Sequence, residues 1–237
     1  MKSGFKNTRI EFLMPLFTGV LCSLFLCAVI GVSYGYFEAP VMIEIISEAE
    51  PEDDDVFRFS VPRNRTDPLL EYYRNPEYHE WVIGFFERIC SNRDIAQTIL
   101  DNADHFNVPP ALAFALSWEE SRFNPRAVNR SNRDGSIDRG LFQLNNRSFP
   151  HLEIHAFYDI ELNTRYGIGH LRHCLNTGGT EVSALAMYNA GTGRVRTTGA
   201  PHVTLDYVSR IMDNRQRIES HFYSRLTRFE ETRFTER

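Results

Sequence analysis

Lysine is almost absent from this chain of 237 residues. Both lysines lie within the first six residues, so arginine and histidine supply all later basic side chains. Acidic residues are also unevenly placed, because residues 38–55 contain eight of them and no Lys or Arg. The chain after residue 55 is close to electrical neutrality and lacks the clustered basic charge by which proteins bind nucleic acid. We therefore expect no nucleic-acid partner.

A complete metal-binding pattern is also missing. Two pairs of histidines have the spacing of ligands on one helix, but no cysteine or carboxylate pattern completes a zinc site. The segment SNRDGSID (131–138) is similar to part of a calcium loop, yet Arg130 and Leu141 would occupy its first and last ligand positions. We therefore expect neither a metal nor another cofactor.

Cysteines are few, with four in the whole chain. Cys22 and Cys27 lie in a long apolar run, where we expect them to act as packing residues. Cys90 and Cys174 lie in the later part of the chain. If that part is exported, an oxidising compartment would permit a disulfide between them. Two buried free thiols are the alternative, and the sequence does not choose between the two.

A long uncharged run over residues 12–37 follows three basic residues at the N-terminus. The run is longer than the roughly 7–15 residues of a signal-peptide core and reaches the roughly 20 residues that span a bilayer. Basic residues before such a run stay in the cytoplasm, which favours a signal anchor over residues 1–37 that contacts the cytoplasmic membrane. A cleaved signal peptide is the alternative, with small residues at Ser33 and Gly35 as cleavage signals.

The rest of the chain divides by composition. Residues 38–68 are acidic and contain several prolines, so they are expected to form a solvated linker. Within them, VFRFSV (56–61) alternates apolar and polar side chains and predicts at most a short strand. Residues 69–227 repeat apolar side chains at helical spacing, which predicts a mainly α-helical domain. Residues 228–237 are expected to be a C-terminal tail.

Start and stop signals divide the domain into helices. Ser91, with Asp94 three residues later, is expected to cap one helix, and Pro109 and Pro110 suit the first turn of the next. The stretch 124–140 is rich in Asn, Arg, Gly, Asp and Ser and is expected to be a loop. Helices are expected over 67–90 with an interruption at Pro76, then over 91–107, 108–123, 160–178 and 204–229. The stretch 181–195 is expected to be a short apolar helix that runs into a glycine-rich turn.

Two neighbouring glutamates stand in SWEESRFNP (117–125). Neighbours on a helix point about 100° apart, so Glu119 and Glu120 cannot share one face. Both touch the edge of the apolar stripe that contains Ala115 and Leu116. Helical spacing alone therefore does not decide which carboxyl enters a cleft and which is solvated.

Four blocks of sequence occur in the order and rough spacing of a known family. They are ALAFALSWEESRFNPRAV (111–128), GSIDRGLFQLN (135–145), ALAMYNAGTGRV (184–195) and, more weakly, TLDYVSRI (204–211). Together they resemble the soluble lytic transglycosylase domain, a goose-type-lysozyme-like family that cleaves bacterial peptidoglycan. The resemblance implies a lysozyme-like helical domain that acts on peptidoglycan strands. It also implies a place in the cell envelope, either anchored in the inner membrane and facing the periplasm or exported.

The resemblance selects Glu120 as the catalytic residue, because the family's catalytic glutamate directly precedes the serine that is Ser121 here. Glu119 is then expected to be a solvated neighbour, and Ser121 a structural partner within the turn. The loop before the Gln block is longer than in the family, so Ser131 and Ser136 are both candidates for the family's serine. The substrate-binding residues that the resemblance implies are Gln143, Tyr188, Asn189 and Tyr207, with Ser136 from the loop.

Cleavage of a glycosidic bond needs an acid that keeps its proton near neutral pH. Desolvation can raise the pKa of a glutamate from about 4.3 toward about 6. The resemblance implies that Glu120 acts first as acid and then as base on the MurNAc–GlcNAc β-1,4 bond, which leaves a 1,6-anhydroMurNAc end. It also implies that the Tyr207 hydroxyl reaches this carboxyl. A hydrolase of the same bond and an inactive wall-binding protein are the alternatives.

Overall fold

The structure, a computed structural model, describes residues 66–235. The expected signal segment, most of the expected acidic linker and the strand expected at 56–61 lie outside the described residues and stay predictions. Among the described helices, none combines the length and the apolar character needed to cross a bilayer.

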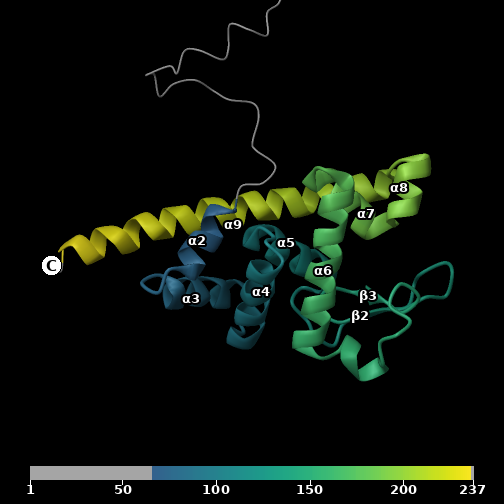
Figure 1. The fold of residues 1–237 in the computed structure, drawn as a ribbon, viewed down its shortest axis with the longest axis horizontal. Helices are drawn as coiled ribbons and strands as arrows, with labels where there is room; N and C mark the ends of the chain where they lie inside the picture. Colours follow the sequence, from purple (N-terminus) through teal and green to yellow (C-terminus); the bar gives the residue numbers. More distant parts are fainter. Residues whose placement is uncertain (1–65, 236–237) are drawn as a thin grey trace, which may run out of the picture. The chain divides into compact units, whose positions relative to one another are not determined.

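The described chain is mainly helical, as the sequence predicts (Figure 1). Helices α2 to α5 precede a small sheet, and α6 to α9 follow it. Their bounds are α2 Pro68–Arg74, α3 His79–Cys90, α4 Arg93–His105, α5 Pro110–Ser121, α6 Ile160–Gly178, α7 Glu181–Ala190, α8 Thr192–Thr198 and α9 His202–Thr235, with a short 3-10 helix η1 at Ile154–Phe157. The expected helices are thereby confirmed, including the break before α3. One difference is α8, a short helix that forms where the sequence predicts a glycine-rich turn.

One helix cap differs from the expectation. Asn92 caps α4, because its side chain accepts a hydrogen bond from Ile95 N at 3.0 Å. Ser91 instead ends α3, with a left-handed φ of 56°. The expected cap at Ser91 was wrong by one residue. Ser and Asn are both good capping residues, and Ser91 is already the C-terminal cap of the preceding helix, so the cap of α4 falls to Asn92.

Helix α5 is the centre of the fold. Its first eight residues are buried, and α4 and α9 pack against it. Phe86 of α3 stacks on Phe114 of α5 with ring centroids 4.1 Å apart, and Phe85 meets Phe222 of α9 at 5.1 Å. Close packing on these sides fixes the position of the C-terminal end of α5.

Helix α9 is the longest element and passes α2, α5 and α7 (Figure 1). The expected domain boundary at residue 227 falls inside it, since the helix continues to Thr235. Phe229 stacks on Trp81 of α3 with ring centroids 5.2 Å apart, and Arg233 pairs with Glu77 at 2.7 Å. The described part of the expected tail is therefore helical and packed.

The expected loop contains two strands of a small antiparallel sheet. Its strands are β1 Val128–Asn129, β2 Asp138–Arg139 and β3 Leu144–Asn145, in the order β1-β2-β3. The register pairs Asp138 with both Asn129 and Asn145. Strands of two residues carry too little alternation to be recognised in a sequence.

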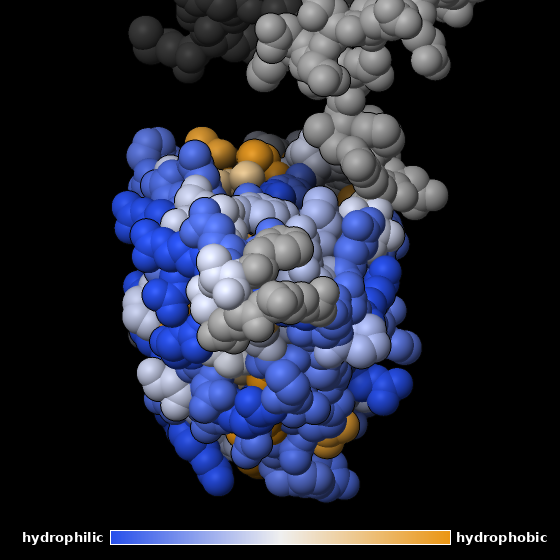
Figure 2. Space-filling model, turned by 90° about the vertical axis from the view of Figure 1, so that its left-hand side faces the viewer, coloured by the Kyte–Doolittle hydropathy of each residue, from blue (hydrophilic) through white to orange (hydrophobic). Residues whose placement is uncertain are grey.

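The interior of the domain also holds its two described cysteines. Cys90 and Cys174 are both buried free thiols, so the disulfide alternative is excluded. The face seen in Figure 2 is mostly hydrophilic, with a few apolar side chains at its margins. Apolar side chains are thus concentrated inside, as in other folded domains.

Candidate active site

The segment 139–142 lies against three helices, and each of them holds its backbone. Ser121 at the end of α5 donates its hydroxyl to one carbonyl of the segment at 2.8 Å, and Tyr188 of α7 donates to another at 2.9 Å. Asn163 of α6 accepts from a backbone N–H of the segment at 2.8 Å and donates to a carbonyl at 3.0 Å. The structural role expected for Ser121 is thereby confirmed.

Two glycines permit this close approach to α6. A Cβ on Gly140 would lie 2.1 Å from the Phe157 carbonyl oxygen and 2.3 Å from the Asn163 amide nitrogen, and its φ of +80° also favours glycine. A Cβ on Gly167 of α6 would lie 2.3 Å from Phe142 Cβ. Larger residues at either position would push the segment away from the helix.

Glu120 lies in the last turn of α5, half-buried at the edge of a cavity. The Tyr207 hydroxyl of α9 donates a hydrogen bond to its carboxylate, as the resemblance implies. Burial raises the pKa of Glu120 to about 8. The Tyr207 hydrogen bond opposes this rise, whereas the charges of Asp138 and Glu119 add to it. Glu120 therefore carries a proton at neutral pH, which a general acid requires.

Glu119 is not the solvated neighbour that the sequence suggested. Its side chain is 8% exposed and pairs with Arg210 of α9 at 2.7 Å and with Arg122 at 3.4 Å. Neighbouring positions on α5 diverge, so Glu120 meets Tyr207 while Glu119 meets Arg210. The expectation that Glu119 is solvated was wrong. Helical spacing shows that the two glutamates point in different directions, but it does not show that α9 places Arg210 beside Glu119.

One face of α9 aligns both sides of the site. Thr204 donates its hydroxyl to Asn189 Oδ1 of α7 at 2.8 Å, and Tyr207, three residues later, reaches Glu120 of α5. Arg210 follows after three more residues with its ion pair to α5. Residues three apart are neighbours on a helix surface, so a single stripe of α9 sets the ends of α5 and α7 relative to each other.

A cavity of about 680 Å³ opens beside Glu120. This volume is in the range of small-molecule binding sites. Its lining brings together four of the five residues expected to bind substrate, which are Ser136, Gln143, Tyr188 and Asn189. The fifth, Tyr207, is buried and contacts the carboxyl of Glu120.

Gln143 and Asn189 present complementary polar groups to the cavity. Gln143 Nε2 donates to the carbonyls of Ala127 at 3.2 Å and Gly140 at 2.9 Å, which leaves Oε1 without a partner among the described residues. Asn189 Oδ1 accepts from Thr204, which leaves Nδ2 without a partner in the same part of the chain. An acceptor and a donor suit the N-acetyl and hydroxyl groups of sugars.

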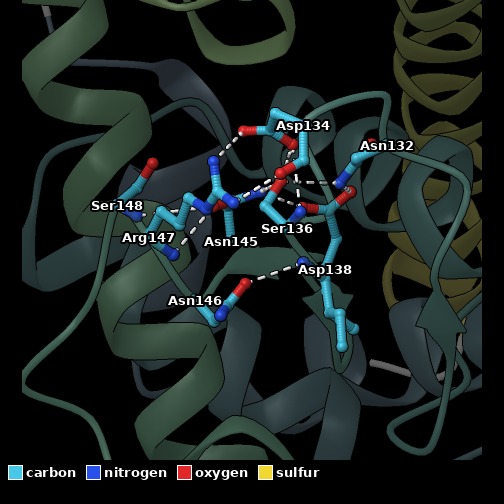
Figure 3. A network of polar contacts seen from close by, with 9 residues as sticks. Asn132, Asp134, Ser136, Asp138, Asn145, Asn146, Arg147 and Ser148 are labelled. Atoms are coloured by element: carbon cyan, nitrogen blue, oxygen red, sulfur yellow. Dashed lines mark hydrogen bonds and ion pairs between the residues drawn. The ribbon is translucent and has the colours of Figure 1, made fainter.

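Ser136 belongs to a polar network beside the cavity (Figure 3). Its hydroxyl donates to Asp134 at 2.7 Å and accepts from Asn132 at 3.2 Å and Asn145 at 2.8 Å. Arg147 pairs with Asp134 at 3.0 Å. The Ser136 hydroxyl, with its donor and both acceptor sites used, has a structural role in this loop. The substrate contact implied for Ser136 stays a prediction.

Asp138 is a site residue that the sequence analysis missed. It lines the cavity together with Glu120, and its charge acts on the pKa of Glu120. Its carboxylate accepts amide hydrogen bonds from Asn132 at 2.8 Å and Asn145 at 2.7 Å (Figure 3). A third comes from Asn129 at 3.0 Å. The sequence does contain a signal for this role, because several asparagines that could donate to a carboxylate surround Asp138. Hydrophobic periodicity does not detect such a cluster.

His170 of α6 completes the cavity beside Tyr188, with ring centroids 5.0 Å apart. Burial and the nearby His173 lower the pKa of His170, so its imidazole is neutral at neutral pH. Within residues 66–235, no three His, Cys, Asp or Glu side chains gather in a way that would hold a metal ion. The described side chains of the cavity offer carboxyl, amide, phenol, imidazole and guanidinium groups.

Comparison with known proteins agrees with this geometry. The family model of the Transglycosylase SLT domain matches residues 97–206, a range that contains Glu120, Gln143, Tyr188 and Asn189. The chain is also similar to Invasion protein IagB of Salmonella typhimurium, in strains SL1344 and LT2, and of Salmonella typhi. Each is 28% identical over 120 residues, which cover 48% of this chain and 72% of the relative. Residues 97–206 thus match the Transglycosylase SLT domain family, which confirms the resemblance carried by the four sequence blocks.

Proposed function

We propose that this chain is a peptidoglycan lytic transglycosylase with a lysozyme-like catalytic domain. It cleaves the β-1,4 bond between MurNAc and GlcNAc and leaves 1,6-anhydroMurNAc ends. The observation that carries the proposal is the carboxyl of Glu120, which keeps its proton at neutral pH and opens onto a cavity with free amide groups. The family match over residues 97–206 supports the same reaction class.

The proposed reaction uses Glu120 twice. Protonated Glu120 gives its proton to the O4 oxygen of GlcNAc as the bond from that oxygen to C1 of MurNAc breaks. The 2-acetamido oxygen of MurNAc stabilises the positive charge that develops at C1. The Glu120 carboxylate then takes the proton of the C6 hydroxyl, whose oxygen bonds to C1. No water is consumed, and the enzyme returns to its protonated form.

The surrounding residues position the sugar and the carboxyl in this proposal. Gln143 Oε1 and Asn189 Nδ2 bind amide and hydroxyl groups of the glycan, and Tyr188 lines the cavity. Tyr207 orients the Glu120 carboxyl and stabilises its ionised form between the two proton transfers, because its hydroxyl donates to that form. These groups hold the reacting atoms close together, a main source of rate enhancement.

Asp138 favours a second candidate, a muramidase that hydrolyses the same bond. Hydrolytic glycosidases pair an acid with a second carboxylate, and Asp138 lies in the same cavity as Glu120. Three amide donors hold the Asp138 carboxylate, which then faces any positive charge that develops in the cavity. The two candidates differ in the nucleophile at C1, which is the sugar's own C6 hydroxyl in one case and water in the other.

The products of the purified full chain on isolated sacculi distinguish the candidates. Mass spectrometry should find 1,6-anhydroMurNAc ends for a transglycosylase, and reducing ends would instead assign hydrolysis. Glu120→Gln keeps the size of the side chain and removes the acid, so it should abolish release of fragments. Wall cleavage by that variant at the wild-type rate would exclude Glu120 as the catalytic acid. Binding to sacculi without any turnover by the wild type would identify an inactive wall-binding protein.

The substrate places the proposed activity in the cell envelope. The uncharged run at residues 12–37 is the proposed membrane anchor, with the catalytic domain on the periplasmic side. N-terminal sequencing of the mature protein tests the anchor, because a start near Tyr36 would show that the run is removed and the protein exported.

A further inference from the structure

Two arginines of the cavity have no side-chain partner among the described residues. Arg133 lies in the loop between β1 and β2, and Arg194 lies on α8. Both side chains line the cavity beside Glu120 and both residues are exposed. Within residues 66–235, neither guanidinium forms an ion pair or a hydrogen bond. Two separate segments of the chain thus bring free cationic groups to one cavity.

The other charges of the cavity do not neutralise these arginines. Asp134 is paired with Arg147 at 3.0 Å and also accepts two hydrogen bonds from Ser136. Asp138 is held by three asparagine amides. Burial keeps Glu120 protonated at neutral pH. The lining therefore has a surplus of positive charge at Arg133 and Arg194, although the described domain has similar numbers of acidic and basic residues.

The backbone of a GlcNAc–MurNAc glycan offers hydroxyl and N-acetyl groups, which are neutral. Its anionic groups are the carboxylates of the peptide attached to the lactyl group of MurNAc. A guanidinium donates paired N–H groups that match the geometry of a carboxylate. The peptide begins at the sugar whose C1 atom reacts, so its carboxylates lie beside the cavity when that sugar lies next to Glu120.

We propose that Arg133 and Arg194 bind carboxylates of the stem peptide on MurNAc, so that this domain prefers peptide-bearing glycan to bare glycan. The inference rests on the proposed function, because it assumes that the cavity takes peptidoglycan. In this inference Arg133 and Arg194 select the substrate but take no part in the proton transfers at Glu120.

The test compares kcat/KM of the purified full chain on two substrates. One is soluble glycan strands with their stem peptides. The other is the same strands after an amidase has removed the peptides and the lactyl carboxylates that it frees have been converted to amides. Arg133→Gln and Arg194→Gln should each lose about fivefold in kcat/KM on the peptide-bearing strands, the upper range for an exposed ion pair, and nothing on the bare strands. Arg225→Gln, an exposed position of α9 outside the cavity, should match the wild type on both.

A third substrate tests the charge itself. Peptide-bearing strands whose carboxylates have been converted to amides should be cleaved by the wild type at the lower rate of the bare strands. Equal loss on bare and peptide-bearing strands would overturn the inference, since the arginines would then contact sugar. Equal wild-type rates on both substrates would also overturn it and leave the proposed function intact. Failure of the wild type to cleave any strand would overturn both proposals.

Discussion

At the scale of single residues, Glu119 and Glu120 occupy different electrostatic environments although one peptide bond joins them. Glu119 pairs with Arg210 and Arg122, and Glu120 receives only a phenol hydroxyl. A buried carboxyl without a cationic partner, such as Glu120, keeps its proton to higher pH. The sequence SWEES thus supplies one structural ion pair and one acid.

Tyr207→Phe should change both the rate and the pH profile. Its hydrogen bond favours ionised Glu120, so its loss raises the pKa of that carboxyl above about 8. The alkaline limb of kcat/KM, which reports loss of the acid's proton, should move to higher pH. The rate at the optimum should fall about 10-fold, as expected for one hydrogen bond to a charged group. An unshifted alkaline limb would show that Tyr207 acts only in packing.

Asp138→Asn should move the alkaline limb in the opposite direction. The charge of Asp138 raises the pKa of Glu120, so its removal lets Glu120 lose its proton at lower pH. In the proposed reaction the rate should also fall about 10-fold or more, because a neutral side chain at position 138 would not stabilise positive charge that develops in the cavity. Kinetics across pH, with product analysis by mass spectrometry, measures both effects. If the variant keeps the wild-type rate and pH profile, Asp138 has no role in the reaction.

At the scale of elements, α9 links the end of the domain that holds Glu120 to the opposite side of the fold. Its early residues Thr204 and Tyr207 hold α7 and α5. Its later residues Phe229 and Arg233 pack against Trp81 and the turn before α3. Because the helix is continuous from His202 to Thr235, packing at its far end also restrains the stripe that positions Glu120.

Phe229→Ala tests whether the end of α9 belongs to the folded domain. Phe229 is half-buried against Trp81 and beneath the Arg233 guanidinium, so its truncation should lower the free energy of unfolding by about 1–2 kcal/mol. Arg225→Ala, exposed on the same helix, should change it by less than about 0.5 kcal/mol. Denaturant titration of both variants measures the difference. Equal stability of the two would mean that residues after 227 behave as a tail.

At the scale of the whole molecule, the sequence predicts the helices well, and the residue that it proposes as the acid, Glu120, lines the cavity. Periodic apolar residues and strong breakers such as Pro109 mark the helices, and the four family blocks single out Glu120 as the proposed acid. Contacts between elements could not be predicted in the same way. The ion pair of Glu119 with α9 depends on how two helices pack, and the amide contacts of Asp138 depend on a sheet of two-residue strands. Neither leaves a periodic signal.

Burial of Glu120 should also be visible in the stability of the whole domain. The native state holds the proton of Glu120 up to about pH 8, whereas the unfolded chain releases it near pH 4.5. The native state therefore binds more protons than the unfolded state between these values, so this residue lowers stability as pH rises through them. The slope reaches at most about 1.4 kcal/mol per pH unit, the free energy that corresponds to one unit of pKa.

Glu120→Gln removes this titration and leaves every other titrating side chain in place. The variant should therefore become progressively more stable than the wild type from about pH 4.5 to about pH 8, and the difference should then stay constant. Unfolding by denaturant at a series of pH values gives the difference directly. A constant difference across this range would mean that the Glu120 carboxyl is solvated in the native state. The same experiment therefore tests the physical basis of the proposed acid without any substrate.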